Sequence, residues 1–482
     1  MDDASPLARG EKTAPEQEQP EIAEEALHHQ RAPEHHLRRL LLVSLLAPLV
    51  GAGAGFVDAV FRLTLEQADR LRNLLIARGH DAHFLGFLLV VLGCAAAAAF
   101  AAWLVRRFSP HASGSGIPQV EAALNDELPP APPRLLPVKF LGGLSAIGAG
   151  MALGREGPSV QMGAVVAHLV GQLFRHTKEE LRLLLAAGAG AGLAVAFNAP
   201  IAGAVFVLEE LVRRFEPRMT IVALATSSTA IMISRLFLGN APDFHVAILA
   251  PATVATGPLP YASEASWLLY VALGIIAGGV ASLYNRSILG ALTLTGRLRR
   301  VPVEARAAVI GAAVGVVGWF FPKLIGGGDD ITQNLLAGGV AVGAIPLGFL
   351  VRFCLGPISY AARTPGGLFA PLLVLGAQLG LLFGAFCARA FPHLGIAPEA
   401  FAVVGMAAFF TGIVQAPVTG IVLVTEMTAA FTTLLPMLAA CFAAMLVAHL
   451  LRTTPIYDSL LERLIEEAHP QASLPGLQRV TI

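Results

Sequence analysis

An acidic and a basic side chain lie next to each other in a glycine-rich run at residues 154–164, between two apolar segments. An ionisable group at membrane depth is costly, so it marks a pathway or a binding site by default. Neighbouring side chains on a helix do not face each other, so we do not expect Arg155 and Glu156 to pair. Pro158 is tolerated in the first turn of a helix. The run therefore predicts a helix that begins inside the membrane, with Glu156 at its mouth.

Two further glycine-rich runs have residue types that suit an anion. In GSGIP, at 114–118, glycines on both sides of Ser115 allow backbone N–H groups and a hydroxyl to converge without interfering side chains. GGLFAP, at 366–371, is a similar turn into a helix. A plain turn between two spans explains either run about equally well.

The sequence also repeats itself. NAPIAGAVFVLE at 198–209 aligns with QAPVTGIVLVTE at 415–426, and upstream 154–158 aligns with 367–371, in the same order and at nearly the same offset. Transporters that are built from repeats bind their substrate where the repeats meet, near the midplane. The alignment leaves open whether the repeats are inverted.

The repeat separates two adjacent carboxylates at the end of an apolar segment. Glu209 matches Glu426 in the second half, whereas Glu210 matches Met427. A carboxylate shared by both halves predicts a structural role, which leaves Glu210 as the functional candidate. Tyr457 follows the last apolar segment, and by itself it would be read as an interfacial aromatic.

The elements that position these residues belong to a membrane protein. Of 482 residues, 55% are hydrophobic and only 14% are charged, and the mean hydropathy is +0.68; globular chains carry about 25% charged residues. The formal net charge is zero, so the chain lacks the basic excess that nucleic-acid binding needs. The four cysteines lie singly in apolar segments without metal-ligand spacing, which predicts packing roles.

Many of the apolar segments are far shorter than the ~20 residues that a full span needs. Short segments interrupted by glycine and proline are typical of discontinuous helices, which exist at depth only where they pack in protein or line a wet cavity. A pore or a carrier is implied. The segments lie at roughly 40–61, 84–105, 137–153, 157–174, 183–196, 200–212, 219–238, 267–288, 305–322, 333–356, 368–391, 398–413, 415–427 and 431–451.

The polar start of the chain, residues 1–37, lacks the pattern of a signal peptide and is predicted to be a disordered tail. Arg31, Arg38 and Arg39 flank the first apolar segment, so the positive-inside rule places this end in the cytoplasm.

Together, GSGIP, GREGPSVQMG (154–163), GGLFAP and the late Tyr457 resemble, in order and spacing, the motifs of the CLC family of chloride channels and chloride/proton antiporters. The resemblance covers about residues 40–465. It implies an all-α polytopic membrane protein of two inverted repeats with tilted and broken helices, which forms a homodimer with one pore per subunit. The transport domain would span 38–452, with repeat one at about 38–238 and repeat two at about 266–451. Residues 453–482 would form a short cytoplasmic helix and tail.

The resemblance also implies the residues of the anion site. Ser115 and Tyr457 match the residues whose hydroxyls hold dehydrated chloride. Ile117, Leu368 and Phe369 match those that lend backbone N–H groups.

Two carboxylates acquire roles from the same resemblance. Glu156 matches the gating glutamate, and Glu210 matches the internal proton glutamate of the exchangers. Gln119 and Gln415 depart from residues seen in some relatives, and we expect neither to alter the anion site. Only about 30 residues follow the last span, so the paired nucleotide-sensing domains of many eukaryotic members are not expected.

The implied function is secondary active exchange of chloride for protons in a bacterial inner membrane, with both termini in the cytoplasm. We expect no enzyme activity and no cofactor, with chloride as the bound substrate. A passive voltage- or pH-gated chloride channel of the same fold is the alternative. Coupling ratio, physiological role, regulation, and nitrate or bromide permeation stay open.

Two alternatives come from other classes of protein. An intramembrane serine protease would use Ser113 or Ser115 with His168 or His449, and it needs a Ser–His pair within hydrogen-bond reach. A cation-coupled solute carrier of another fold would depend on sodium. The protease leaves Glu156, Tyr457 and the repeat unexplained, and sodium-independent transport would exclude the carrier.

Overall fold

The computed structural model describes residues 18–174, 177–246, 264–298 and 300–468, and within these ranges the chain is helical with no β-strand. Two isolated β-bridges join loops of the two halves. In chain order the helices are α1 (Glu18–Asp81), α2 (His83–Phe108), α3 (Ile117–Leu124), α4 (Leu135–Gly148), α5 (Glu156–Leu173), α6 (Lys178–Phe197), α7 (Pro200–Phe206), the π-helix η2 (Val207–Leu211), α8 (Pro217–Leu238), α9 (Glu264–Arg297), α10 (Val303–Phe320), α11 (Asp329–Leu336), α12 (Ile345–Tyr360), α13 (Phe369–Ala390), α14 (Pro398–Val414), α15 (Pro417–Thr428), α16 (Leu434–Leu450) and α17 (Ile456–Ala468).

The helix lengths agree with the predicted mixture of full and partial spans. Nine helices of the described chain are long and apolar enough to cross a bilayer, whereas α4, α14 and α15 are apolar but shorter. One expected segment is wrong: 333–356 is not continuous, because α11 ends at Leu336 and α12 begins at Ile345. Gly338 lies between them with a φ of 70°, a conformation that interrupts a helix.

The start of α1 bears on the predicted tail at 1–37. The helix begins at Glu18, so it covers the second half of that segment, and residues 1–17 lie outside the described residues. The stretch from 18 to 31 is rich in Glu, Ala, Leu and Gln, which are strong helix formers. At the other end, α17 covers part of the predicted C-terminal helix and tail, and residues 469–482 are likewise not described.

Close helix crossings repeat in the two halves. An added Cβ on Gly163 of α5 would lie 2.2 Å from the carbonyl oxygen of Gly188 in α6. In the second half, a Cβ on Gly376 of α13 would lie 2.4 Å from the carbonyl oxygen of Gly405 in α14. Both crossings therefore need glycine, because only a bare backbone permits this approach. The sequence alignment of Gly163 with Gly376 is matched in space.

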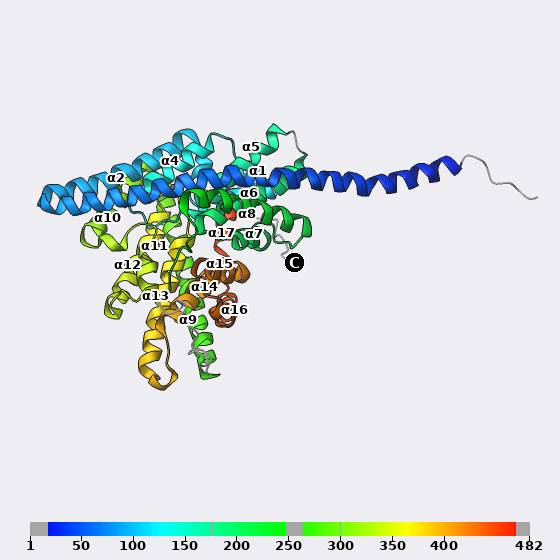
Figure 1. Ribbon diagram of the computed structural model, residues 1–482. Helices are drawn as coiled ribbons and strands as arrows, with labels where there is room; N and C mark the ends of the chain where they lie inside the picture. Colours follow the sequence, from blue (N-terminus) through cyan, green and yellow to red (C-terminus); the bar gives the residue numbers. More distant parts are fainter. Residues whose placement is uncertain (1–17, 175–176, 247–263, 299, 469–482) are drawn as a thin grey trace, which may run out of the picture.

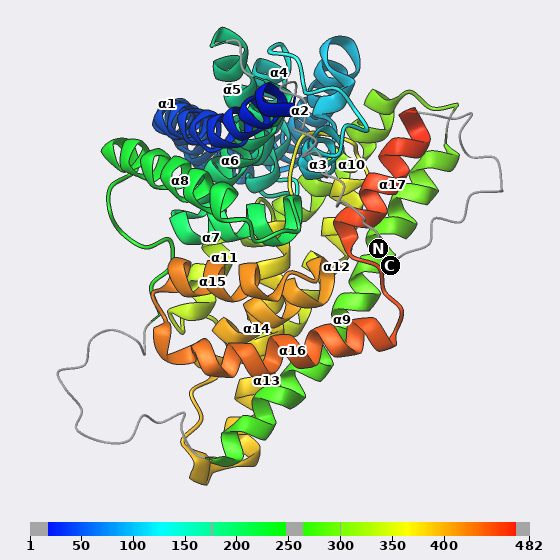
Figure 2. The ribbon, with the colours of Figure 1, turned by 90° about the vertical axis from the view of Figure 1, so that its right-hand side faces the viewer.

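A glutamate from each repeat accepts hydrogen bonds from the other repeat. Glu209 accepts hydrogen bonds from the N–H groups of Val418 (3.0 Å) and Thr419 (2.6 Å) at the start of α15. Glu426, at the end of α15, accepts from Ile201 (3.2 Å) and Ala202 (2.7 Å) at the start of α7. Each segment therefore caps the N-terminus of the other. The two run antiparallel side by side (Figure 2), as inverted repeats require.

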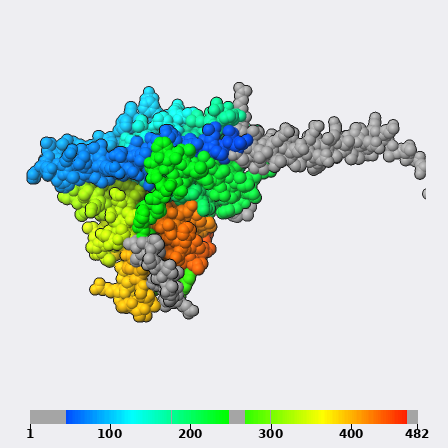
Figure 3. Space-filling view, viewed as in Figure 1, coloured from blue at the N-terminus to red at the C-terminus, as the bar shows by residue number. Residues whose placement is uncertain are grey.

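The two halves form two bodies that meet along the middle of the molecule. In Figure 1 the helices of the first half, in blue, cyan and green, lie above α9, α13, α14 and α16 of the second half, whereas α10 of the second half packs beside α2. The space-filling view in Figure 3 shows the same division. Helix α17 packs against α3 in the first half, so the end of the chain returns to the boundary between the bodies.

Candidate functional site

Three of the predicted motif loops are joined by backbone hydrogen bonds. The N–H of Gly114 donates to Thr364 O (3.2 Å), and the N–H of Gly366 donates to Gly114 O (3.1 Å). Gly154 and Gly367 exchange two hydrogen bonds, of 2.9 and 2.7 Å. GSGIP, GREGP and GGLFAP, which are far apart in the sequence, therefore meet at one place between the two halves.

Three helices begin at this junction. Helix α3 starts at Ile117, α5 at Glu156 and α13 at Phe369. Gly116, just before α3, has a φ of 92°, which a residue with a side chain rarely adopts. The first N–H groups of a helix have no intrahelical partner, and this end carries a partial positive charge. The prediction that a helix begins at Glu156 is confirmed, and the junction gathers donors suited to an anion.

The Glu156 carboxyl occupies this junction. It is 1% exposed and lies beside the N–H groups of Glu156 itself and of Ala370, in the first turn of α13, and its Oε2 has no hydrogen bond of normal geometry within the described chain. A Cβ on Gly154 would lie 1.9 Å from Oε2, and one on Gly367 would lie 3.0 Å from it. The carboxyl thus fills the space that the two glycines leave, at the position where the α13 amides would face an anion.

Two buried hydroxyls lie on the other side of the junction. Ser115 Oγ would be 2.5 Å from a Cβ on Gly157, and the Tyr457 hydroxyl lies close to Ser115. Ser115 is 1% exposed and Tyr457 is fully buried, yet neither hydroxyl has a hydrogen bond of normal geometry within the described chain. Buried polar groups are costly without a partner, so the pair marks a place for a polar ligand.

An aromatic cluster fixes the Tyr457 ring. Its centroid lies 5.7 Å from that of Phe369, which in turn packs edge-on against Phe206 (5.8 Å) and Phe410 (4.8 Å). Ile117 and Leu368 are also fully buried. The five predicted chloride-site residues are thus gathered around the starts of α3 and α13 and the start of α17.

The two adjacent glutamates point to different places. Glu209 caps α15, so its contacts support the structural role that the repeat predicted. Glu210 is 4% exposed, and its Oε1 has no hydrogen-bond partner among the described residues. Both belong to η2, a π-helical turn that no sequence pattern indicated. Such turns are frequent at functional sites, and here the turn separates the directions of neighbouring carboxylates.

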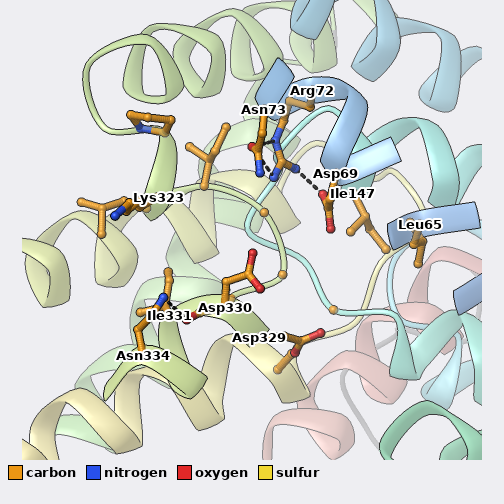
Figure 4. Close-up of a pocket in the computed structure, with 18 of the residues that line it drawn as sticks. Leu65, Asp69, Arg72, Asn73, Ile147, Lys323, Asp329, Asp330, Ile331 and Asn334 are labelled. Carbon is orange, nitrogen blue, oxygen red and sulfur yellow. Dashed lines mark hydrogen bonds and ion pairs between the residues drawn. The ribbon is translucent and has the colours of Figure 1, made fainter. Parts of the chain in front are cut away.

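A cavity of about 910 Å³ adjoins Glu156. Figure 4 shows carboxylates on its wall, with Asp329 from α11 and Asp69 bonded to Arg72 of α1. Arg155 contacts Asp329 (2.6 Å) and lies 3.5 Å from Asp243, so its charge is matched by residues other than Glu156, as expected. These partners were missed because they belong to segments distant in sequence.

Arg62 extends the same network. It contacts Asp243 at 2.9 Å, and the side chain of Asp243 is only 5% exposed. The chain of ion pairs therefore runs from α1 through Asp243 and Arg155 to Asp329 in the second half. It lies across the cavity wall next to the gating candidate.

Ser113 and His168 of the protease alternative contact other groups, whereas the Ser115 hydroxyl has no hydrogen bond within the described chain. Ser113 Oγ donates to Arg363 O (3.1 Å), and the N–H of Ser115 donates to the Tyr360 hydroxyl (3.4 Å). His168 Nε2 contacts Gln172 at 3.0 Å. No Ser–His pair of the kind that a protease needs occurs within the described residues.

Comparison with known proteins gives a consistent result. The sequence model described as "Voltage gated chloride channel" matches residues 97–449. The H(+)/Cl(-) exchange transporter ClcA of Cronobacter sakazakii is 39% identical over 450 residues, which cover 91% of this chain and 92% of that protein. ClcA of Klebsiella pneumoniae is 36% identical over 446 residues, with the same shares.

Solved structures show the same likeness. A slow cyanobacterial Cl-/H+ antiporter has a TM-score of 0.82 and 31% identity, with 89% of this chain and 98% of that chain covered. A CLC-type fluoride/proton antiporter has a TM-score of 0.70 over 85% of this chain and 95% of its own, and at 22% identity it speaks for the fold alone.

Proposed function

Since the chain belongs to the CLC family of voltage-gated chloride channels and their transporter relatives, we propose that it exchanges chloride for protons across a membrane by secondary active transport. The observation that carries the proposal is the buried Glu156 carboxyl, which fills the space above Gly154 and Gly367 beside the start of α13. Similarity to proteins named H(+)/Cl(-) exchange transporters supports exchange over passive conduction.

The proposed chloride ligands are the Ser115 and Tyr457 hydroxyls and the N–H groups of Ile117, Leu368 and Phe369. A chloride ion that enters the junction loses water, and donors must offset that loss. Helix N-termini supply partial charges and N–H groups, which bind the anion without the full positive charge that would trap it. This argument needs no cofactor, since chloride itself is the bound substrate.

The proposed coupling depends on Glu156 competing with the anion. When ionised, its carboxylate takes the place of a chloride ion at the α13 amides. When it carries a proton it is neutral, and it can leave the amides to chloride. Protonation and anion occupancy are therefore linked at one place, which couples the two fluxes.

Glu210 is proposed to pass protons between the cytoplasm and the protein interior. Its side chain is buried, but it belongs to η2, outside the junction of the three loops. Protons and chloride would thus share the path at Glu156 and use separate routes beyond it.

The remaining proposals concern assembly and setting. We propose a homodimer with one pore per subunit, in a bacterial inner membrane, with both termini in the cytoplasm. The transport domain would comprise 38–452, with repeats at about 38–238 and 266–451, between a tail at 1–37 and a C-terminal helix and tail at 453–482. The family likeness supports this arrangement.

Reconstituted protein tests the function directly. In liposomes that start with a chloride gradient and equal pH on both sides, an exchanger moves protons opposite to chloride. The pH of the lumen therefore changes, and a pH gradient builds up across the membrane. A passive channel moves chloride without changing the pH once the membrane potential is clamped with potassium and valinomycin. Chloride flux without proton movement would reject exchange. Loss of transport on removal of sodium would favour a cation-coupled carrier.

A further inference from the structure

One guanidinium contacts two carboxylates and a backbone oxygen beside the proposed chloride site. Arg213, which follows η2, contacts Glu121 Oε1 at 3.2 Å and forms an ion pair with Asp458. Its Nε also donates to the backbone oxygen of Glu210 at 3.3 Å. The backbone of Arg213 has a φ of 56°, a conformation that non-glycine residues rarely adopt and that persists where surrounding contacts hold it.

Each partner of Arg213 belongs to an element of the proposed site. Glu121 is in α3, the helix that begins at Ile117. Asp458 directly follows Tyr457 in the first turn of α17. The single cation therefore ties the helix that carries the Tyr457 hydroxyl to the helix that begins at the Ser115 loop.

The exposure of the three groups suits a contact that opens and closes. The side chains of Arg213 and Asp458 are 48% and 30% exposed, whereas that of Glu121 is 3% exposed. The Arg213–Asp458 pair can separate into water at little cost, because a half-exposed ion pair stabilises weakly. Glu121 Oε2 has no hydrogen-bond partner in the described chain, so this carboxyl depends on Arg213 for compensation.

We propose that Arg213 and Asp458 form a latch that positions Tyr457 against Ser115 and so closes one side of the anion site. The latch consists of positioning residues that act through Tyr457, and the inference rests on the proposed function. With the latch closed, the start of α17 is held against α3. Chloride then passes only when Glu156 gains or loses a proton. With the latch broken, Tyr457 moves away from Ser115, and chloride passes without a matching proton.

The same helix offers a matched control. At its far end, Glu467 accepts a hydrogen bond from Arg363 at 3.2 Å, in another exposed ion pair between α17 and the rest of the chain. It lies ten residues after Tyr457, or about 15 Å along a helix. Arg214, next to Arg213, makes no ion pair in the part of the chain that the structure describes, so its loss removes a charge without breaking the latch.

The test compares full-length variants in liposomes and in detergent. Asp458→Asn and Arg213→Gln should lower the number of protons moved per chloride at least about twofold, without slowing chloride flux. They should also weaken chloride binding, measured by titration calorimetry, by about two- to fivefold, the range that a half-exposed pair supports. Asp458→Glu, Glu467→Gln and Arg214→Gln should keep the wild-type ratio and affinity.

Two results would overturn the latch. One is wild-type coupling and chloride affinity in Asp458→Asn; the other is an equal loss in Glu467→Gln, which would mean that any loosening of α17 has this effect. If the wild-type protein moves no protons, the exchange proposal fails instead. The calorimetric comparison of Asp458→Asn with Asp458→Glu would still decide the latch.

Discussion

Glu156 lies where its own negative charge can replace that of an anion. Its carboxyl is buried, lies beside the Ala370 N–H and fills the gap above Gly154 and Gly367. In the proposed mechanism the carboxylate therefore acts as an anion that the protein itself supplies.

Replacing that carboxyl should separate the two fluxes. Glu156→Gln keeps the size of the side chain but cannot exchange a proton, so we expect proton movement to disappear while chloride flux continues. Simultaneous chloride and pH electrodes on liposomes measure both. Proton transport at the wild-type rate in this variant would remove Glu156 from the coupling step.

Glu210 allows a comparison with its neighbour. Glu210→Gln should reduce proton flux at least about tenfold and leave chloride binding intact, because the residue lies outside the anion junction. Glu209→Gln is the control, since it removes an adjacent carboxylate that only caps α15. If both variants retain coupling, Glu210 has no part in moving protons.

At this scale, prediction from sequence succeeds for features that are set locally. The helix start at Glu156 follows from glycine and proline positions within one turn, which are visible in the motif. The partners of Arg155 are different, because Asp329 lies 174 residues away in the chain. No local pattern specifies such a pair.

At the scale of elements, the π-turn η2 explains why two neighbouring glutamates contact different parts of the protein. The π-turn adds a residue to the helical repeat, so Glu209 reaches the first N–H groups of α15 while Glu210 remains in the interior. The repeat alignment identified Glu209 as structural, but the turn itself had no sequence signature.

The exchanged caps should both contribute to stability. Hydrogen bonds to a charged acceptor stabilise by about 1.5–3 kcal/mol, and each glutamate accepts from two backbone N–H groups. Glu209 also accepts from the Thr419 hydroxyl at 2.7 Å. Glu209→Gln and Glu426→Gln should each lower the thermal unfolding temperature in detergent, and Glu209→Gln should lower it more. A fall in only one of them would show that the other cap does not contribute.

At the scale of the whole molecule, ion pairs join the halves across the cavity beside Glu156. Arg62 and Arg155 belong to the first half and Asp329 to the second, and Asp243 lies between the two arginines. Asp243 and Asp329 offset the charge of Arg155 at the cavity wall, so we expect the cavity to bind chloride weakly. A fold assembled from distant segments was predictable from repeats and motifs, whereas this network depends on the final packing.

Asp329→Asn should therefore strengthen chloride binding from the cavity side. Removing the closest partner of Arg155 leaves about one uncompensated charge, worth about 1 kcal/mol near water, or roughly fivefold in apparent chloride affinity. Transport rates at varied chloride concentration measure it. Asp330→Asn is the control, because its carboxylate makes no ion pair in the described chain. An unchanged affinity in Asp329→Asn would mean that Arg155 does not act on the anion.

The reciprocal capping of α7 and α15 constrains how the protein is made. The ribosome completes residues 200–206 long before it reaches residue 426, whose carboxylate satisfies the first amides of that short helix. Until nearly the whole polypeptide has been synthesised, the first N–H groups of α7 therefore lack this hydrogen-bond partner. We therefore expect the two halves to complete their folding together.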